Sequence, residues 1–217
     1  FTTIGGQTRN RIGALDTTTM TSNATAWDPN ANAQVNTLSL SGSTVYAGGT
    51  FTTIGGQTRN RIAALDTAIT TNNAMAWDPN ANAAVQQVIV EGSTLYAIGS
   101  FTTIGGQTRN RIAALSTTLN TNMATNWDPN PNSTVYAIAI SNQLLYAVGN
   151  FTNIGGQVRN YAAALDISVN TGMATTWHPD ANNLVSSVTL SGGKVFLFGS
   201  FGSIGGETRA KVAVLDP

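Results

Sequence analysis

The chain has 217 residues, 41% of them hydrophobic, so it can bury a substantial core and is not a disordered chain. Only 9% of the residues are charged, and ten basic side chains balance ten acidic ones, which gives no electrostatic footprint for a nucleic acid or an anionic membrane. Cysteine is absent, which excludes a disulfide framework, thiolate chemistry and zinc held by cysteine.

One decapeptide, FTTIGGQTRN, begins at Phe1 and recurs unchanged at Phe51 and Phe101. Related segments begin at Phe151 and Phe201, so the chain reads as four repeats (1–50, 51–100, 101–150 and 151–200) and a partial fifth (201–217). A period of this length is typical of a supersecondary unit that cannot bury its own apolar face and is completed by its neighbours. We therefore treat 1–217 as one domain built from repeats.

The second repeat shows the predicted elements in chain order. They are RIAALD at 61–66, AMAWDP at 74–79, VQQVIVEG at 85–92 and TLYAIGS at 94–100. Each run is short, rich in β-branched, aromatic or small residues, and bounded by turn residues. No run lasts long enough between Gly, Pro or Asn for an amphipathic helix. The pattern predicts an all-β protein.

Four short strands in about 50 residues, repeated, are the signature of a β-propeller of four-stranded antiparallel blades. The predicted blade has VQQVIV innermost, then TLYAIG, then RIAALD, with AMAW at the rim. Residues 35–79, 85–129 and 135–179 then form whole blades, and 185–216 supply three strands of a fourth. We expect a four-bladed ring first, an incomplete larger ring second and a ring shared between two chains third.

Closure of a four-bladed ring would use Ala24 to Trp27 as the missing rim strand of residues 185–216, which would remove an exposed sheet edge. One segment is then in surplus, because 10–16 and 210–216 are copies of the same element. We expect unpaired blade edges to be a route to self-association.

The segments LYAIGS, RIAALDT and AMAW together resemble the repeat of pyrroloquinoline-quinone-type propellers. The full unit, GGTFTTIGGQTRNRIAALD followed by AWDPNAN, more closely resembles tandem propeller repeats of secreted bacterial proteins of unknown function. The resemblance implies that the tryptophan docks blade against blade. It implies no cofactor here, because nothing in the chain matches the calcium-bound quinone site of those enzymes.

Two repeated residue types are candidates for ligand binding. The tryptophans could stack on sugar faces, although burial as a wedge between blades is the simpler interpretation. The first arginine column could bind carboxylate or phosphate groups, although pairing with equally periodic aspartates is again simpler. The candidate residues are Arg9, Arg59, Arg109 and Arg159, with Trp27, Trp77, Trp127 and Trp177.

The DPNAN loop places oxygen-bearing side chains at alternate positions, Asp28, Asn30 and Asn32, as the start of a calcium loop does. The Gly and bidentate Glu of an EF-type loop are missing, so a tight turn is the favoured interpretation and calcium the alternative. His178, the only histidine, occupies the aspartate position of its repeat and has Asp180 nearby. We interpret it as a substituted turn residue rather than half of an acid–base site.

Catalysis requires unlike groups held together, whereas near-identical copies repeat like groups, so we expect no enzyme activity. We expect an extracellular or cell-surface propeller that acts as a rigid structural or interaction module and binds protein or glycan at the cell surface. The alternative is a multivalent lectin with one weak site per blade, since equivalent sites on one body gain avidity. We expect no nucleic acid partner and no membrane insertion.

Overall fold

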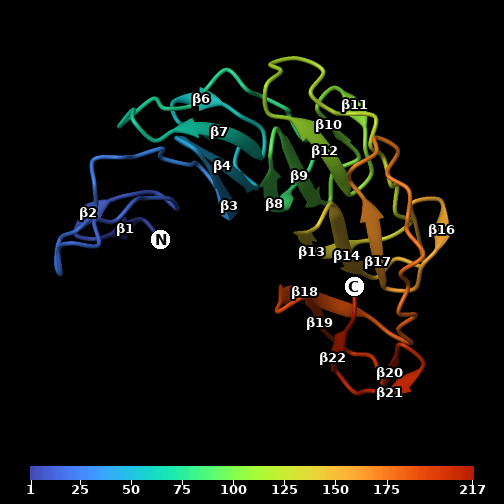
Figure 1. Ribbon diagram of the computed structural model, residues 1–217. Helices are drawn as coiled ribbons and strands as arrows, with labels where there is room; N and C mark the ends of the chain where they lie inside the picture. Colours follow the sequence, from blue (N-terminus) through green and yellow to red (C-terminus); the bar gives the residue numbers. More distant parts are fainter.

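The strands of the computed structural model, which describes residues 1–217, follow the repeat closely (Figure 1). Four three-stranded antiparallel sheets succeed one another along the chain. The first is β3 (Val35–Ser41), β4 (Thr44–Gly49) and β7 (Ile62–Asp66); the second is β8 (Val85–Glu91), β9 (Thr94–Gly99) and β12 (Ile112–Ser116); the third is β13 (Val135–Ser141), β14 (Leu144–Gly149) and β17 (Ala162–Asp166); the fourth is β18 (Val185–Ser191), β19 (Lys194–Gly199) and β22 (Val212–Leu215). The all-β prediction and the predicted strand order are confirmed.

Each sheet is a meander with its first strand on the inside and its third on the outside. Tight two-residue turns join the first two strands, as where Asn142 and Gln143 both have positive φ and link Ser141 to Leu144. Turns of this type match the right-handed twist of antiparallel strands. A β-bulge interrupts the register near the start of each inner strand, as between Val85 and Gln87.

Each IGGQ segment, or IGGE in the last repeat, lies in a small hairpin instead of a simple turn. Its two strands have two residues each, and the two glycines form the turn between them. The hairpins are β1 (Thr3–Ile4) with β2 (Gln7–Thr8), β5 (Thr53–Ile54) with β6 (Gln57–Thr58), β10 (Thr103–Ile104) with β11 (Gln107–Thr108), β15 (Asn153–Ile154) with β16 (Gln157–Val158), and β20 (Ser203–Ile204) with β21 (Glu207–Thr208). In the second repeat Gly55 has a φ of 60°, and a Cβ there would lie 2.5 Å from the main-chain nitrogen of Ala74. Close backbone approach therefore explains the first glycine of the pair in the four complete repeats.

The predicted fourth strand of each blade is shorter than expected. AMAW contributes one bridge pair, Leu65 with Ala74, flanked by main-chain hydrogen bonds from Asp66 to Asn73 and from Met75 to Ala64. The other complete repeats have equivalent bridges. Pairing stops there because the chain turns away to place its tryptophan against the next sheet.

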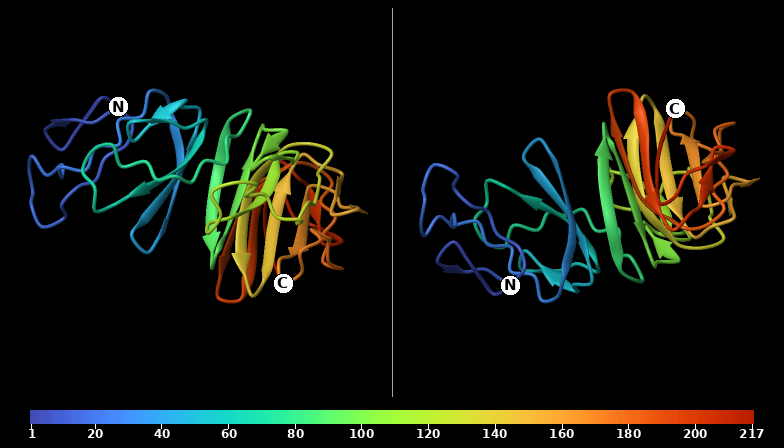
Figure 2. Two further views of the ribbon diagram at one scale, coloured as in Figure 1. Left: turned by 90° about the horizontal axis from the view of Figure 1, so that it is seen from above. Right: turned by 90° about the horizontal axis from the view of Figure 1, so that it is seen from below.

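The sheets stand along an open arc, with the inner strands on its concave side and most of the short hairpins on its convex side (Figure 1). Views from above and below show that the strands of the second, third and fourth sheets run alongside one another (Figure 2). The ends of the arc do not meet, so closure through Ala24–Trp27 is not formed. Ala24 bridges Leu15 of its own repeat instead. That contact is local in sequence and costs less chain entropy than joining segments nearly 200 residues apart.

The apolar core lies between successive sheets. Between the first two sheets, Tyr46, Ile62 and Ala64 belong to one buried cluster with Val88 and Leu95. Equivalent clusters join the second sheet to the third and the third to the fourth. A smaller cluster joins the N-terminal residues to the first sheet. Each sheet is thus covered by its neighbours, as the repeat period predicts. The structure holds no helix with the length and apolar character to cross a bilayer.

Candidate functional site

The tryptophan column forms the joint between one sheet and the next. The Trp77 side chain is 3% exposed, and its indole Nε1 donates a hydrogen bond of 2.8 Å to the carbonyl of Ser116 in the next sheet. Its ring meets Tyr46 of its own sheet edge to face, with centroids 5.2 Å apart at 82°. Such aromatic contacts add to the stabilisation from burial. The docking role implied by the family resemblance is what the geometry shows.

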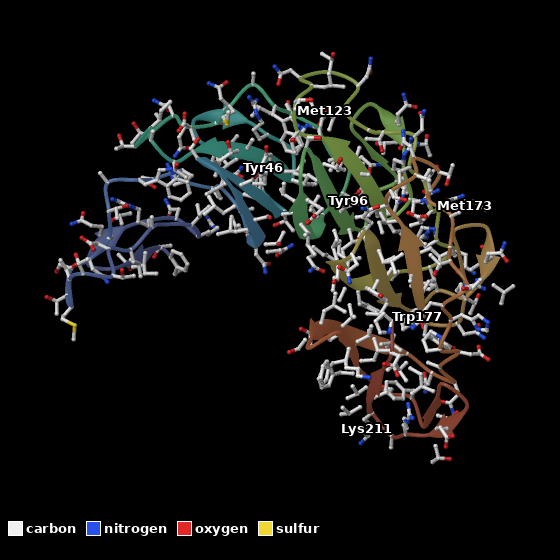
Figure 3. All side chains as sticks on the ribbon, in the orientation of Figure 1. Tyr46, Tyr96, Met123, Met173, Trp177 and Lys211 are labelled. Atoms are coloured by element: carbon white, nitrogen blue, oxygen red, sulfur yellow. The ribbon has the colours of Figure 1, made fainter.

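The same joint recurs along the chain (Figure 3 labels Tyr46, Tyr96 and Trp177). Trp127 donates to Asp166 and meets Tyr96 at 5.3 Å, while Trp177 donates to Asp216. Trp127 is buried and Trp177 is partly exposed. Packing between sheets covers the Trp77 and Trp127 rings, which leaves them little surface to stack on a sugar.

Burial also affects the tyrosines of these joints. It raises the pKa of the Tyr46 phenol, while a hydrogen bond with Thr117 opposes the shift. The pKa of Tyr96 is raised to about 12 by burial and, to a smaller extent, by the negative charge of Glu91. Burial likewise raises the pKa of Tyr146. These phenols therefore stay neutral at ordinary pH, which suits their packing between sheets.

Trp27 has no aromatic partner of the kind that Tyr46 provides for Trp77. Its indole still donates to the next sheet, at 2.9 Å from the carbonyl of Asp66. Beside the ring lies a cavity of about 410 Å³ lined by Ala14, Thr25, Val45 and other side chains. The equivalent cavity beside Trp127, which Tyr96 helps to line, measures about 250 Å³.

The first arginine column is occupied by local contacts. Arg59 donates from Nη1 to the carbonyl of Thr58 at 2.7 Å and from Nη2 to the carbonyl of Met75 at 2.5 Å. Its Nη1 also lies 3.8 Å from a carboxylate oxygen of Asp78. The guanidinium thereby ties the hairpin loop to the rim segment of the same repeat. Its side chain is only 13% exposed, which limits contact with a ligand.

Arg9 and Arg109 repeat this arrangement, with ion pairs of 3.9 Å to Asp28 and 3.7 Å to Asp128. In each pair the arginine Nε and the second carboxylate oxygen are buried without a protein partner. Arg159 keeps a 2.6 Å bond to the carbonyl of Thr175, but His178 stands where the aspartate would be. The pairing of arginine with aspartate, expected as the simpler interpretation, is present in three repeats.

The DPNAN loops are held by hydrogen bonds. Asn30 has a φ of 50°, and its side-chain oxygen accepts a 2.7 Å bond from Asn10. The oxygen of Asn32 accepts bonds from the main-chain nitrogens of Thr52 and Thr53 in the next repeat, at 2.9 and 3.1 Å. The side-chain oxygens of Asn30 and Asn32 thus bind different protein partners instead of converging on one point. No group of three or more acidic or histidine side chains gathers elsewhere in the structure.

The inner strands differ between copies, as does the loop between each RIAALD-type strand and the following tryptophan. The bulge position, exposed in every sheet, is Asn36, Gln86, Tyr136 and Ser186 in turn. The next position reaches the neighbouring sheet: the Thr37 hydroxyl accepts a bond from the Val88 nitrogen at 3.2 Å. Sequence reasoning singled out residues that repeat and so missed this surface. Divergence of the inner strands between copies was the available signal.

A family model described as a domain of unknown function (DUF5122) beta-propeller matches residues 44–67, which span β4 and β7. No curated protein matches the sequence significantly. The match is shorter than one repeat, but it agrees with the succession of antiparallel sheets. The chain is therefore built from propeller-type repeats.

Three solved structures share this fold. The computationally designed Ika4 protein matches with a TM-score of 0.54 and 14% identity, over 84% of this chain and 91% of that one. The designed Ika8 protein matches with a TM-score of 0.53 and 14% identity, over 87% and 47% of the two chains. BamB from Moraxella catarrhalis matches with a TM-score of 0.50 and 17% identity, over 91% and 51%. The chain spans about half the length of Ika8 and BamB.

Proposed function

We propose that the protein is a non-catalytic, extracellular or cell-surface interaction module that binds a protein partner along the concave side of its arc. The observation that carries this proposal is that recurrent and varying side chains have different roles within the repeat. Side chains that recur unchanged are engaged in holding the sheets together. The inner strands are among the segments that differ between copies, and they include exposed positions.

Support for a non-catalytic role comes from the use of the polar groups. The arginines bond to main-chain carbonyls, the asparagines hold turns, and Tyr46, Tyr96 and Tyr146 pack between sheets. A general acid or base requires a titratable group beside an unlike partner within reach of a substrate. Structural bonding of the recurrent groups favours a scaffold over such a site.

The concave side suits a protein partner of polar character. Its exposed bulge positions include amide, hydroxyl and phenol groups, and Tyr136 is 44% exposed. Tyrosine combines apolar area with a polar tip, which makes it a common anchor at protein interfaces. The low overall charge gives little long-range steering, so contact would depend on shape and hydrogen bonds. The low charge and the Thr- and Asn-rich loops also support the extracellular assignment.

The test combines location with binding. Producing cells are fractionated, and the tagged chain is then used to capture proteins from their isolated envelope. We expect the chain in the surface or culture fraction and a captured protein that Tyr136→Ala releases. The matched control is Val158→Ala, which removes an exposed apolar side chain from β16 on the convex side and should leave capture unchanged. Cytoplasmic location, or capture indifferent to Tyr136→Ala, would contradict the proposal.

A further inference from the structure

A second column of arginines stands directly before the third strand of successive sheets. Arg61 precedes β7, Arg111 precedes β12, and Arg11 holds the same position in the first repeat. Each donates one side-chain hydrogen bond, from Nη1 to a main-chain carbonyl 20 positions further along the chain, over 2.8 to 3.1 Å. We call Arg11, Arg61 and Arg111 the open arginine row.

The open arginine row differs from the first arginine column in what surrounds its nitrogen atoms. Arg59 of the first column bonds to carbonyls through both Nη atoms, its Nε is buried, and Asp78 lies beside it. The Nε and Nη2 atoms of Arg61 and Arg111 bond to no protein group and are open to solvent. The ion pairs of the structure involve neither residue. Both guanidinium groups therefore keep unused donors.

These arginines have a backbone conformation that is costly for any residue with a side chain. The φ angle is 66° at Arg11 and Arg61 and 64° at Arg111, in the left-handed region that favours glycine. Tyr161 and Lys211 hold the same position with φ of 63° and 68°, so the turn forms without arginine. Residues held in this region cluster at functional sites. The guanidinium groups are thus available for a role other than forming the turn.

Successive sheets bring the open arginine row to one face of the arc. The inner strands are joined by hydrogen bonds between residues 51 positions apart. The Val88 nitrogen donates to the Thr37 hydroxyl, and the Gln87 amide donates to the carbonyl of Ile138. Consecutive sheets therefore run in the same direction, which Figure 2 shows for the second, third and fourth. Equivalent residues lie on the same face, and we call the face where the third strands begin the arginine face.

The opposite face of the arc carries acidic side chains. Asp66 ends β7, Asp166 ends β17, and Asp16 holds the same position in the first repeat. Glu91 ends β8, which runs in the same direction as the third strand β12 because β9 is antiparallel to both. A chain with no net charge is therefore cationic along one face and anionic along the other. We call the face where the third strands end the acidic face.

The carboxylates that share the arginine face leave the open row without a counter-charge. The aspartates of the first three DPNAN-type loops are already paired with the first arginine column; they are Asp28, Asp78 and Asp128. Asp180 and Glu207 belong to the fourth and fifth repeats, beyond the row. The arginine face also adjoins the concave side, since β13 begins there and Tyr136 is its second residue. A partner that covers Tyr136 can therefore continue onto the row.

We propose that the open arginine row binds an extended acidic segment of the protein partner. This inference rests on the proposed function, because it names the chemistry by which the same partner is recognised. Nε and Nη2, the donors left free in Arg61 and Arg111, lie on the same side of the planar guanidinium group. They form a fork that matches the two oxygens of a carboxylate, and such paired charge-assisted bonds are strong and directional.

The spacing of the row favours a protein segment over a nucleic acid. Sheets pack about 10 Å apart and diverge outward along the arc, while an extended chain rises about 3.3 Å per residue. A carboxylate at about every fourth residue then reaches successive arginines and stays on one face of the segment. Phosphates of one DNA strand recur about every 3.4 Å along the helix axis, so most of them would face no arginine.

The test uses a labelled synthetic peptide of the repeat Glu-Ser-Thr-Ser, long enough to cross three sheets, and follows its binding by fluorescence anisotropy. Arg61→Tyr and Arg111→Tyr copy the residue that the fourth repeat accepts at this position, so circular dichroism should show an unchanged fold. Each should weaken binding roughly 5-fold or more, and the two together roughly 25-fold. Arg61→Lys and Arg111→Lys keep the charge but lose the fork, so each loss should be intermediate.

Two controls separate the arginine face from charge in general. Lys194→Gln removes a cation from the start of β19, on the acidic face, and should leave peptide binding unchanged. A peptide of the same composition with its glutamates adjacent should bind more weakly than the spaced one. Equal binding of both peptides, tighter binding of single-stranded DNA, or binding that the double tyrosine variant leaves intact would overturn the inference. So would self-association that the double variant abolishes, since a second copy's acidic face would then be the occupant.

Capture from the isolated envelope distinguishes failure of this inference from failure of the proposed function. We expect the double tyrosine variant to release the captured protein, as Tyr136→Ala does. A captured protein that Tyr136→Ala releases and the double variant retains would overturn the acidic segment and leave the interaction module standing. A cytoplasmic chain that still binds the spaced peptide through Arg61 and Arg111 would overturn the cell-surface role and leave the carboxylate-binding row standing.

Discussion

Replacement of Trp77 by alanine tests whether the tryptophan joint holds the sheets together. The indole is 3% exposed, meets Tyr46 edge to face and donates to the carbonyl of Ser116 at 2.8 Å. A tryptophan that buries about 150–250 Å² contributes roughly 4–6 kcal/mol at about 25 cal/mol per Å². Loss of the hydrogen bond removes a donor from a partly buried carbonyl, at a further cost of about 1 kcal/mol.

Relaxation of the surrounding side chains recovers part of this free energy, so we expect Trp77→Ala to lower the free energy of unfolding by about 3–5 kcal/mol. In a chain of this length that corresponds to a fall in melting temperature on the order of 10 °C. Urea unfolding followed by circular dichroism gives the free energy, and a thermal melt gives the temperature.

The matched control is Trp177→Ala. Trp177 makes the same two contacts, with Tyr146 and with the carbonyl of Asp216, but it is partly exposed beside the last sheet. Its replacement should cost clearly less than that of Trp77, because less apolar area is lost from the core. Equal losses, or a loss below about 1 kcal/mol for Trp77→Ala, would refute the view that burial between sheets governs the role of this column.

Two further predictions concern the joints between repeats. Asn82→Ala removes hydrogen bonds to the nitrogens of Thr102 and Thr103 and to the Thr102 hydroxyl, so urea unfolding should show a free energy of unfolding lower by about 1–3 kcal/mol. Asn183 bonds only its neighbour Leu184, so Asn183→Ala should change that free energy little. The folded-state pKa of Tyr96 is raised to about 12, so the stability that the neutral phenol contributes is complete below the ordinary tyrosine pKa near 10 and is lost as pH rises through 12. Tyrosinate absorbance should show this late titration, and ionisation of all five tyrosines near pH 10 would contradict it.

Strand order and the role of the tryptophan could be predicted because both depend on short-range chemistry. Turn residues bound each run, and the recurrence of one large aromatic per repeat indicates a wedge between identical units. The same reasoning anticipated that arginine and aspartate pair. It did not anticipate the second function of Asn32, which fixes two main-chain nitrogens of the following repeat, since that contact depends on how two loops meet in space.

The rim segment shows where strand propensity fails. AMAW has the residues of a strand, yet only Ala74 forms a bridge, because Trp77 must leave the sheet plane to reach Ser116 of the next sheet. A packing requirement between units therefore overrides a local preference. The IGGQ hairpins show the converse, strands that form without a strand-like sequence. A positive φ at both Gly55 and Gly56 permits a tight turn, and the two residue pairs that flank it form a short ladder that no run of apolar residues predicts.

Ring closure could not be predicted for a different reason. Each repeat determines how it packs on the next, and the same contact applied again generates an arc whose size depends on a small rotation per sheet. No single residue encodes that rotation, so near-identical repeats are compatible with rings of different size. What the residues do encode is the joint between neighbouring sheets, where Trp77 meets Tyr46 and donates to Ser116, and where Trp127 meets Tyr96 and donates to Asp166.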